Sequence, residues 1–177
     1  MKRKILTIIA ALAISTIPSE VVIADEICDT WLSEEYQQYC IDIGTEYGIC
    51  PELLVAIIET ESSGKAKATN GNCRGLMQVN LPYHKERMQR LGVTDLYDAR
   101  QNILCGTDYL FELFQECEDV SWVLMTYNGS AKATSLYENG KMTKYSELIL
   151  QRSFDLERLH EEQNKIETES QIECYEQ

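Results

Sequence analysis

Basic residues are scarce in this chain of 177 residues, which carries 16 lysines and arginines against 29 aspartates and glutamates. The formal net charge is −13 at pH 7, and no stripe of basic side chains offsets it. An acidic surface of this kind repels the phosphate backbone of nucleic acids. Nucleic-acid binding is therefore excluded as the function.

Metal-binding motifs are missing as well. The two histidines, His84 and His160, are not at metal-ligand spacing from any cysteine, and the chain has no CxxC pair. We therefore expect neither a zinc site nor any other cofactor. No segment repeats with a period of about 20–50 residues, so a single core of ordinary size is the simplest architecture.

The apolar run at the N-terminus, residues 5–17, is too short to span a bilayer comfortably. It follows the positively charged residues 1–4 and is succeeded by the small residue Ala24. These are features of a signal peptide. We interpret residues 1–24 as a cleaved signal peptide, which predicts a secreted or cell-envelope protein. An uncleaved membrane anchor running to Ala24 is the alternative.

If the protein is exported, its seven cysteines can form disulfides, because thiols outside the cytoplasm can be oxidised. We predict three disulfides and one odd thiol, and the alternative is that all the cysteines are buried free thiols. Cys28 and Cys40 are twelve residues apart, as are Cys105 and Cys117. Twelve residues of helix rise about 18 Å, so neither pair could form a disulfide within one helix. The remaining cysteines are Cys50, Cys73 and Cys174.

Apolar residues recur at helical spacing in most of the chain. The predicted helices cover residues 29–43, 51–63, 98–117, 120–127 and 145–160. Residues 64–83 are rich in glycine and asparagine and predict a loop with a small hairpin around Asn70-Gly71. We therefore predict a mainly α single domain over residues 25–155. Residues 156–177 form an acidic tail that we expect to be solvated or partly disordered.

The helix predicted to begin at Pro51 carries Glu61 in an unusual place. On a wheel of about 100° per residue, Glu61 continues the apolar stripe, whereas Glu52 and Glu59 share the opposite side. Glu59 is thus expected to be solvated. Burial would raise the pKa of Glu61, and a protonated carboxylic acid can donate a proton to the oxygen of a glycosidic bond. Periodicity alone also allows Glu61 to lie past the buried section and point to water.

Four patches in order resemble the SLT-type lytic transglycosylases, over roughly residues 47–145. Each patch alone is weak, but four in the right order with compatible gaps are specific. They are Pro51-Glu52-Leu53-Leu54 with Ala56-Ile57-Ile58 and Glu61-Ser62, Gly75-Leu76-Met77-Gln78, Asn102-Ile103 with Gly106-Thr107-Asp108-Tyr109-Leu110, and Tyr127-Asn128-Gly129.

The resemblance implies a lysozyme-like α (α+β) fold and a reaction with a single catalytic carboxyl group, that of Glu61. Glu61 would protonate the oxygen that links N-acetylmuramic acid to N-acetylglucosamine, while the acetamido group of the muramic acid stabilises the positive charge. Ionised Glu61 would then take the proton of the 6-hydroxyl, which closes a 1,6-anhydro ring. No water is consumed, so the second carboxylate of two-acid glycosidases is not required.

By the same resemblance, five residues would bind substrate or order the site. Met77 and Gln78 would line the glycan groove, and Tyr127 would lie near the acid. The others are Ser62, which would order the site, and Asn128, which would hold the turn or contact sugar. Two of these residues have a purely structural alternative. Met77 could fill the core, and Tyr127 could be a buried ring whose hydroxyl is hydrogen-bonded within the protein.

The chain departs from the common family pattern at Cys73, before the Gly-Leu-Met-Gln loop, and at Ser130, after the Tyr-Asn-Gly turn. Both departures concern the shape of the groove and leave the acid in place. Gly75 is expected to be needed for backbone shape rather than for substrate contact. The negatively charged surface would be repelled by the anionic polymers of some cell walls. We therefore expect glycan binding to depend on a shaped groove and not on general electrostatic attraction.

The expected partners are peptidoglycan glycan strands, and the protein is expected to be a monomer. A secretion or conjugation machinery of the cell envelope is a further partner that the resemblance allows. One alternative is a hydrolytic muramidase (lysozyme) of the same fold, with Asp108 or Asp119 as a second carboxylate. Another is an inactive glycan-binding module of such a machinery. The presence of Glu61 with Ser62 argues against an inactive site.

Overall fold

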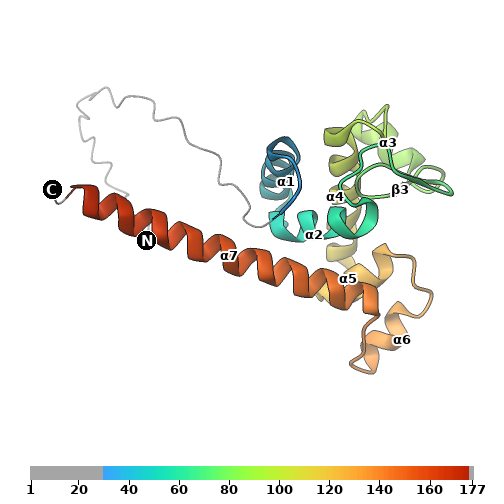
Figure 1. Cartoon of the computed structure of the whole chain (residues 1–177). Helices are drawn as coiled ribbons and strands as arrows, with labels where there is room; N and C mark the ends of the chain where they lie inside the picture. Colours follow the sequence, from blue (N-terminus) through green and yellow to red (C-terminus); the bar gives the residue numbers. More distant parts are fainter. Residues whose placement is uncertain (1–29, 176–177) are drawn as a thin grey trace, which may run out of the picture.

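The computed structural model describes the backbone of residues 30–175 and the side chains of residues 30–166. This part of the chain forms seven helices and a small sheet, which lies at one edge of the molecule (Figure 1). The helices are α1 (Glu34–Tyr47), α2 (Pro51–Ser62), α3 (Lys85–Leu91), α4 (Ala99–Glu116), α5 (Val120–Tyr127), α6 (Ala133–Glu138) and α7 (Lys144–Tyr175). The strands are β1 (Thr69–Asn70), β2 (Cys73–Arg74) and β3 (Val79–Asn80).

The prediction of a mainly helical domain with a small hairpin region is confirmed. The three strands form one antiparallel sheet in the order β1-β2-β3, and Asn70 pairs with Cys73 across the predicted hairpin. Gly71 lies in that turn with a φ of 55°, which favours glycine. Helices α3 and α6 were not predicted, because each is too short to show an apolar period.

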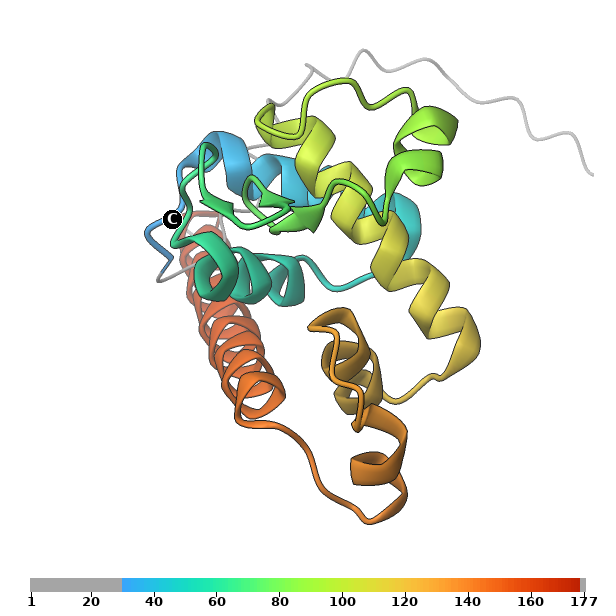
Figure 2. The same ribbon diagram turned by 90° about the vertical axis from the view of Figure 1, so that its right-hand side faces the viewer.

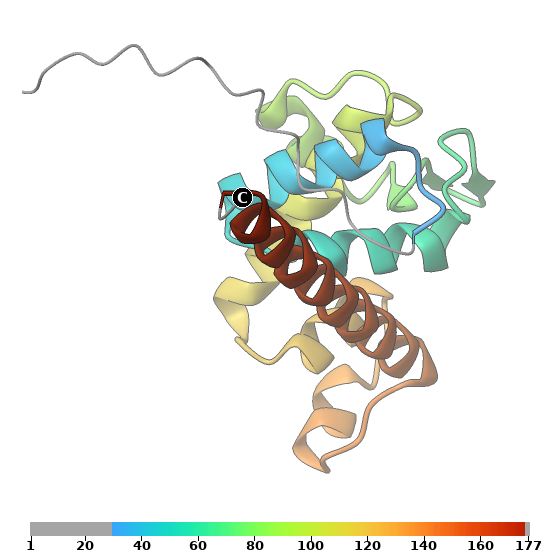
Figure 3. The same cartoon turned by 60° about the vertical axis from the view of Figure 1, so that its left-hand side comes forward.

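Helix α2 lies at the centre of the molecule, and its residues from Leu53 to Ile58 are all buried. Proline is tolerated at its first position, where no intrahelical bond is lost. Helix α1 packs on α2, and α7 also packs along α2 (Figures 2 and 3). Helix α2 is therefore covered on more than the one face that its apolar stripe indicates.

The prediction that Glu59 is solvated is wrong. Its side chain is only 9% exposed, and it forms an ion pair with Arg152 of α7. Glu52, on the same side of α2, is also buried and accepts a hydrogen bond from His160. The helical wheel did not anticipate this burial, because α7 follows about eighty residues later and covers the face that the wheel assigned to water.

Helix α7 is longer than the predicted helix of residues 145–160 and extends beyond the other helices (Figure 1). The chain has no proline or glycine after Gly140, so nothing interrupts the helix. Pairs such as Arg158 with Glu162, at 2.8 Å, support its exposed face. The acidic tail is thus helical to Tyr175, and its side chains at 161–166 are exposed. The domain boundary at residue 155 stays a prediction.

The prediction of three disulfides is not borne out, because five of the cysteines are free thiols. The Cys50 thiol donates to Glu52 and Glu157, while Cys105 lies within α4 and Cys117 is the C-cap at the end of that helix. The other two free thiols are Cys40, in the core, and Cys73. Cys28, the side chain of Cys174 and the proposed signal peptide lie outside the described residues. In the described part, no helix is long and apolar enough to cross a membrane.

Candidate active site

A cleft of about 300 Å³ opens between the end of α2, the small sheet, the middle of α4 and the turn after α5. Its lining combines amide, aromatic and small side chains, as ligand sites commonly do. Of the described residues that line it, Glu61 is the one carboxylic acid. The lining residues are Glu61, Asn70, Cys73, Gln78, Val79, Asn80, His84, Gly106, Tyr109, Tyr127, Asn128 and Gly129.

Glu61 lies in the last turn of α2 with its carboxyl group partly buried. The hydroxyl of Tyr145, at the start of α7, donates a hydrogen bond to its Oε1 at 2.5 Å. Burial raises the pKa of Glu61, and the hydrogen bond from Tyr145 opposes part of that rise. The carboxyl group therefore keeps its proton to a higher pH than a solvated glutamate.

Tyr145 was not predicted as a site residue. It opens α7 and is separated from Glu61 by 84 residues in sequence. Tyr145 is the first residue of the amphipathic helix predicted for residues 145–160. A pattern within that segment says nothing about contact with a residue as distant as Glu61. Its own hydroxyl has a raised pKa because of burial and the neighbouring Glu61 carboxylate, so it acts as a neutral donor.

The loop between β2 and β3 is held in place by the buried side chain of Asn102 in α4. The Asn102 amide donates to the carbonyls of Arg74 and Leu96, each at 2.8 Å, and accepts from the N–H of Met77 at 2.8 Å. Gly75 adopts a φ of 75°, and a Cβ there would lie 2.2 Å from the Asn102 amide. Gly75 is thus required for backbone shape and close approach, as expected.

Met77 does not line the cleft, because its side chain is fully buried beneath it. The space for its sulfur is provided by Gly106 of α4, where a Cβ would lie 2.6 Å from Sδ. The carbonyl of Met77 accepts a hydrogen bond from the Tyr127 hydroxyl at 2.8 Å. Met77 therefore fills the core, and its backbone fixes the ring of Tyr127 beside the cleft.

Ser62 is also buried and outside the lining, since its Oγ donates to the carbonyl of Ile58 at 3.1 Å within α2. Gln78, Tyr127 and Asn128 do line the cleft together with Glu61. Gln78 has a φ of 49°, an unusual conformation for a residue other than glycine, and its side chain donates to Gly75. The structure thus brings three of the five expected binding residues to the acid's cleft.

Three rings that line the cleft, those of Tyr127, Tyr109 and His84, form one of its walls, and the sequence had not indicated it. The centroids of Tyr127 and Tyr109 are 5.5 Å apart, those of Tyr109 and His84 are 4.6 Å apart, and Tyr83 follows at 4.8 Å from His84. The guanidinium of Arg87 lies 4.8 Å from the Tyr109 centroid. Burial and the neighbouring Arg87 lower the pKa of His84 to about 4, so His84 is neutral near pH 7.

Neither aspartate considered as a second carboxylate lines the cleft. Asp108 is buried and accepts from Arg87 at 2.8 Å, Arg90 at 2.5 Å and Tyr47 at 3.1 Å. These donors lower the pKa of Asp108 despite its burial. Asp119 caps α5 by accepting from the first backbone N–H groups of the helix. Both carboxylates are therefore committed to structural contacts.

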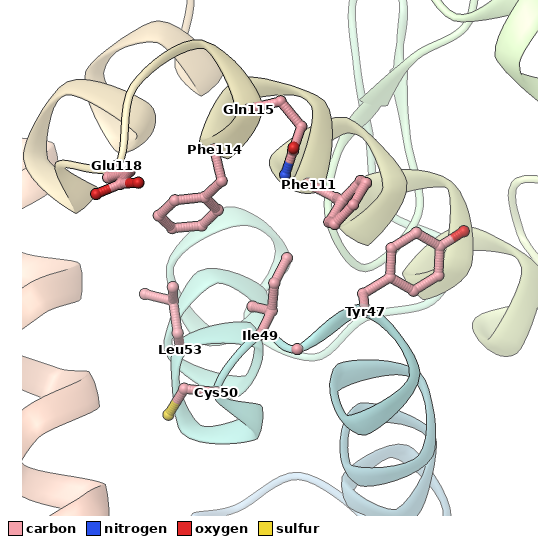
Figure 4. A pocket seen from close by; sticks show the side chains of 9 residues that line it. Tyr47, Ile49, Cys50, Leu53, Phe111, Phe114, Gln115 and Glu118 are labelled. Atoms are coloured by element: carbon pink, nitrogen blue, oxygen red, sulfur yellow. The ribbon is translucent and has the colours of Figure 1, made fainter. Parts of the chain in front are cut away.

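A second cavity, of about 370 Å³, lies between the end of α1, the start of α2 and the end of α4 (Figure 4). Aromatic and aliphatic side chains dominate its lining, among them Phe111, Phe114 and Leu53. Its one carboxylic acid among the described residues, Glu118, is exposed. This cavity does not contain Glu61 and lacks a buried acid, so the cleft is the better candidate for acid catalysis.

Comparison with known proteins identifies a family and a relative. The family model of the transglycosylase SLT domain matches residues 38–149. A protein of Enterobacteria phage PRD1 named "Transglycosylase" is 38% identical over 85 residues, which cover 48% of this chain and 31% of the phage protein. The chain thus aligns with about a third of the phage protein's length. The family match includes both Glu61 and Tyr145.

Proposed function

Because the chain belongs to the transglycosylase SLT domain family, we propose that it cleaves the β-1,4 bond between N-acetylmuramic acid and N-acetylglucosamine in peptidoglycan. The observation that carries the proposal is the position of Glu61. It is the one carboxylic acid among the described residues that line the cleft, and burial raises its pKa. A carboxyl group of that kind is suited to general acid catalysis near neutral pH.

The proposed mechanism uses Glu61 twice. It first donates its proton to the oxygen that links the two sugars, while the acetamido group of the muramic acid stabilises the developing charge. Tyr145 already donates to Oε1 at 2.5 Å, and a hydrogen bond of this type stabilises the carboxylate that remains. The carboxylate then takes the proton of the 6-hydroxyl, and a 1,6-anhydro ring closes. The commitment of Asp108 and Asp119 to structural contacts supports a mechanism with one acid.

We assign substrate contact to Gln78, Tyr127 and Asn128, which line the cleft beside Glu61. Amide groups can form hydrogen bonds with the hydroxyl and acetamido groups of sugars, and aromatic rings can pack against the apolar faces of sugar rings. Ser62 and Met77 are proposed to act from behind the cleft. Ser62 bonds to the last turns of α2, and the Met77 carbonyl holds Tyr127.

The proposed substrate lies outside the cytoplasm, and we therefore propose that residues 1–24 direct the protein to secretion or to the cell envelope. The protein is proposed to work as a monomer. Association with a secretion or conjugation machinery stays a hypothesis from the family resemblance.

The test is digestion of purified peptidoglycan by the protein without residues 1–24, followed by mass analysis of the released sugars. Anhydro ends are expected, and reducing ends would instead indicate a hydrolytic muramidase. Glu61→Gln should lower cleavage by at least about 100-fold, the usual contribution of general acid–base catalysis. Binding of glycan without cleavage by wild-type protein would indicate an inactive module.

Two controls accompany the variant. Glu46→Gln changes an exposed acid of α1 outside the cleft and should cut like wild type. A carboxyl group with a raised pKa weakens folding once it ionises, so Glu61→Gln should be at least as stable as wild type at pH 7. A Glu61→Gln protein that is folded and still cuts normally would overturn the proposal.

A further inference from the structure

Each glutamate of α2 is bound by a side chain of α7. Tyr145 donates to Glu61 at 2.5 Å, Arg152 to Glu59 at 2.7 Å, and His160 to Glu52 at 2.8 Å. The partners follow opposite orders along the two helices, so these contacts define one antiparallel register. We call the three contacts the α2–α7 ladder. Its first rung is the contact with the proposed acid, and the other two lie away from the cleft.

The middle rung has the strongest geometry. Arg152 approaches Glu59 with two nitrogens, Nε at 2.7 Å from Oε2 and Nη2 at 3.2 Å from Oε1. A planar guanidinium that meets both carboxylate oxygens fixes direction as well as distance. On its other side, Glu59 accepts from the Thr30 hydroxyl at 2.7 Å. The Glu59 side chain is 9% exposed and that of Arg152 is 27% exposed, so the pair is partly shielded from water.

Large apolar side chains make up only part of the buried face of α7. In the described part of α7, two of the four buried side chains are serines, Ser146 and Ser153, and the others are Ile149 and Leu156. Small side chains leave shallow ridges that resist sliding less than large ones. A shift of α7 by one residue, about 1.5 Å, would break a hydrogen bond as short as that between Tyr145 and Glu61.

We propose that Arg152 is a positioning residue of the active site: its pair with Glu59 fixes the register of α7 and so delivers the Tyr145 hydroxyl to Glu61. Arg152 itself does not line the cleft and touches no substrate. The proposal rests on the proposed function in one respect, that Glu61 is the acid.

Two further titratable groups lie close enough to Glu61 to interact with it electrostatically, Tyr127 from α5 and Cys73 from β2. Burial raises the pKa of both, so neither carries charge near neutral pH. Among the described residues, Tyr145 is the one whose hydrogen bond lowers the pKa of Glu61. A displaced Tyr145 would therefore leave the pKa of Glu61 higher than in wild type.

The experiment compares Arg152→Gln, Tyr145→Phe and the double variant. Cleavage of peptidoglycan is measured against pH, and the pKa of Glu61 is measured by carboxyl NMR with Glu61→Gln for assignment. We expect both Arg152→Gln and Tyr145→Phe to move the alkaline limb of the profile to higher pH. A misplaced catalytic contact should lower kcat by about ten- to a hundredfold with little change in KM. In the Tyr145→Phe background, Arg152→Gln should add no further shift.

Arg158→Gln is the matched control, because Arg158 pairs with Glu162 on the exposed face of the same helix. Arg158→Gln should leave the pH profile unchanged. Arg152→Lys should restore the wild-type profile only in part, compared with Arg152→Gln. Should Arg152→Gln not fold, Glu59→Gln removes the same pair from the side of α2. An unchanged Glu61 pKa in Arg152→Gln, or an added shift in the double variant, overturns the proposal. The NMR readout needs no activity, so a failure of the proposed function would be recognised separately.

Discussion

Glu59 and Glu61 are two residues apart on α2, and their partners differ in charge. Glu59 is bound by the guanidinium of Arg152, whereas Glu61 is bound by the neutral hydroxyl of Tyr145. A cation would hold a carboxyl group in its ionised form. Glu61 instead keeps a raised pKa and has a donor ready for the moment when it loses its proton. A neutral partner thus suits the proposed role of Glu61, in which the acid cycles between its two forms.

Tyr145→Phe tests this partnership at the level of one atom. In wild type, the hydrogen bond from Tyr145 favours the ionised form of Glu61. The variant lacks this bond, so the pKa of Glu61 rises further and the alkaline limb of the activity profile moves to higher pH. A hydrogen bond to a charged group contributes about 1.5–3 kcal/mol, so kcat should fall about ten- to a hundredfold. Tyr137→Phe on α6 is the control. A limb that moves to lower pH would contradict the assignment.

At the scale of elements, the cleft depends on one amide of α4. Asn102 ties together the loop before β3, the segment that leads into α4, and α4 itself through three hydrogen bonds. Both Gly75 and Gly106 lie where a side chain would collide with this arrangement. The loop that carries Gln78 is therefore placed by contacts outside the cleft.

Asn102→Ala should cost roughly 3 kcal/mol of unfolding free energy, because it removes three buried hydrogen bonds and leaves the Met77 N–H unpaired. Urea denaturation would measure the loss. The comparison is Asn139→Ala, which removes one exposed hydrogen bond to Ser135 and should change stability by less than about 1 kcal/mol. Similar losses in the two variants would show that Asn102 does not organise the loop.

At the scale of the whole molecule, a charge cluster with Asp108 and Arg87 buried at its centre joins α1, α3 and α4. Asp108 of α4 accepts from Tyr47 of α1 and from Arg87 and Arg90 of α3. Arg87 also pairs with Glu112 and contacts His84. The cluster supports the wall of rings from behind, since the guanidinium of Arg87 lies over Tyr109.

Asp108→Asn should destabilise the protein by about 3 kcal/mol at pH 7, because the arginines lose a buried partner. The pKa of Asp108 is lowered by folding, so its contribution is present above the ordinary value of 3.8 and is lost as pH falls through the lower folded value. The difference between wild type and variant should therefore shrink below about pH 4. Thermal unfolding at pH 7 and pH 3 measures it, with Asp42→Asn as an exposed control. A gap that is equally large at both pH values would contradict this account.

Local patterns in the sequence determined much of this protein. The apolar stripe of α2 predicted its buried core and the unusual position of Glu61, and the turn residues predicted the hairpin at Asn70-Gly71. Four short patches predicted the family that the comparison shows. These features are decided by residues close together in the chain, where helical period and turn geometry operate.

Only the tertiary structure decided what covers each face. It placed Met77 in the core, left five cysteines as thiols, and covered Glu52 and Glu59 with α7. It also brought Tyr145 to Glu61 across 84 residues of sequence. Periodicity tells which side of a helix avoids water, but it does not tell which distant element will reach that side or with which register. Those contacts follow from packing of the whole chain.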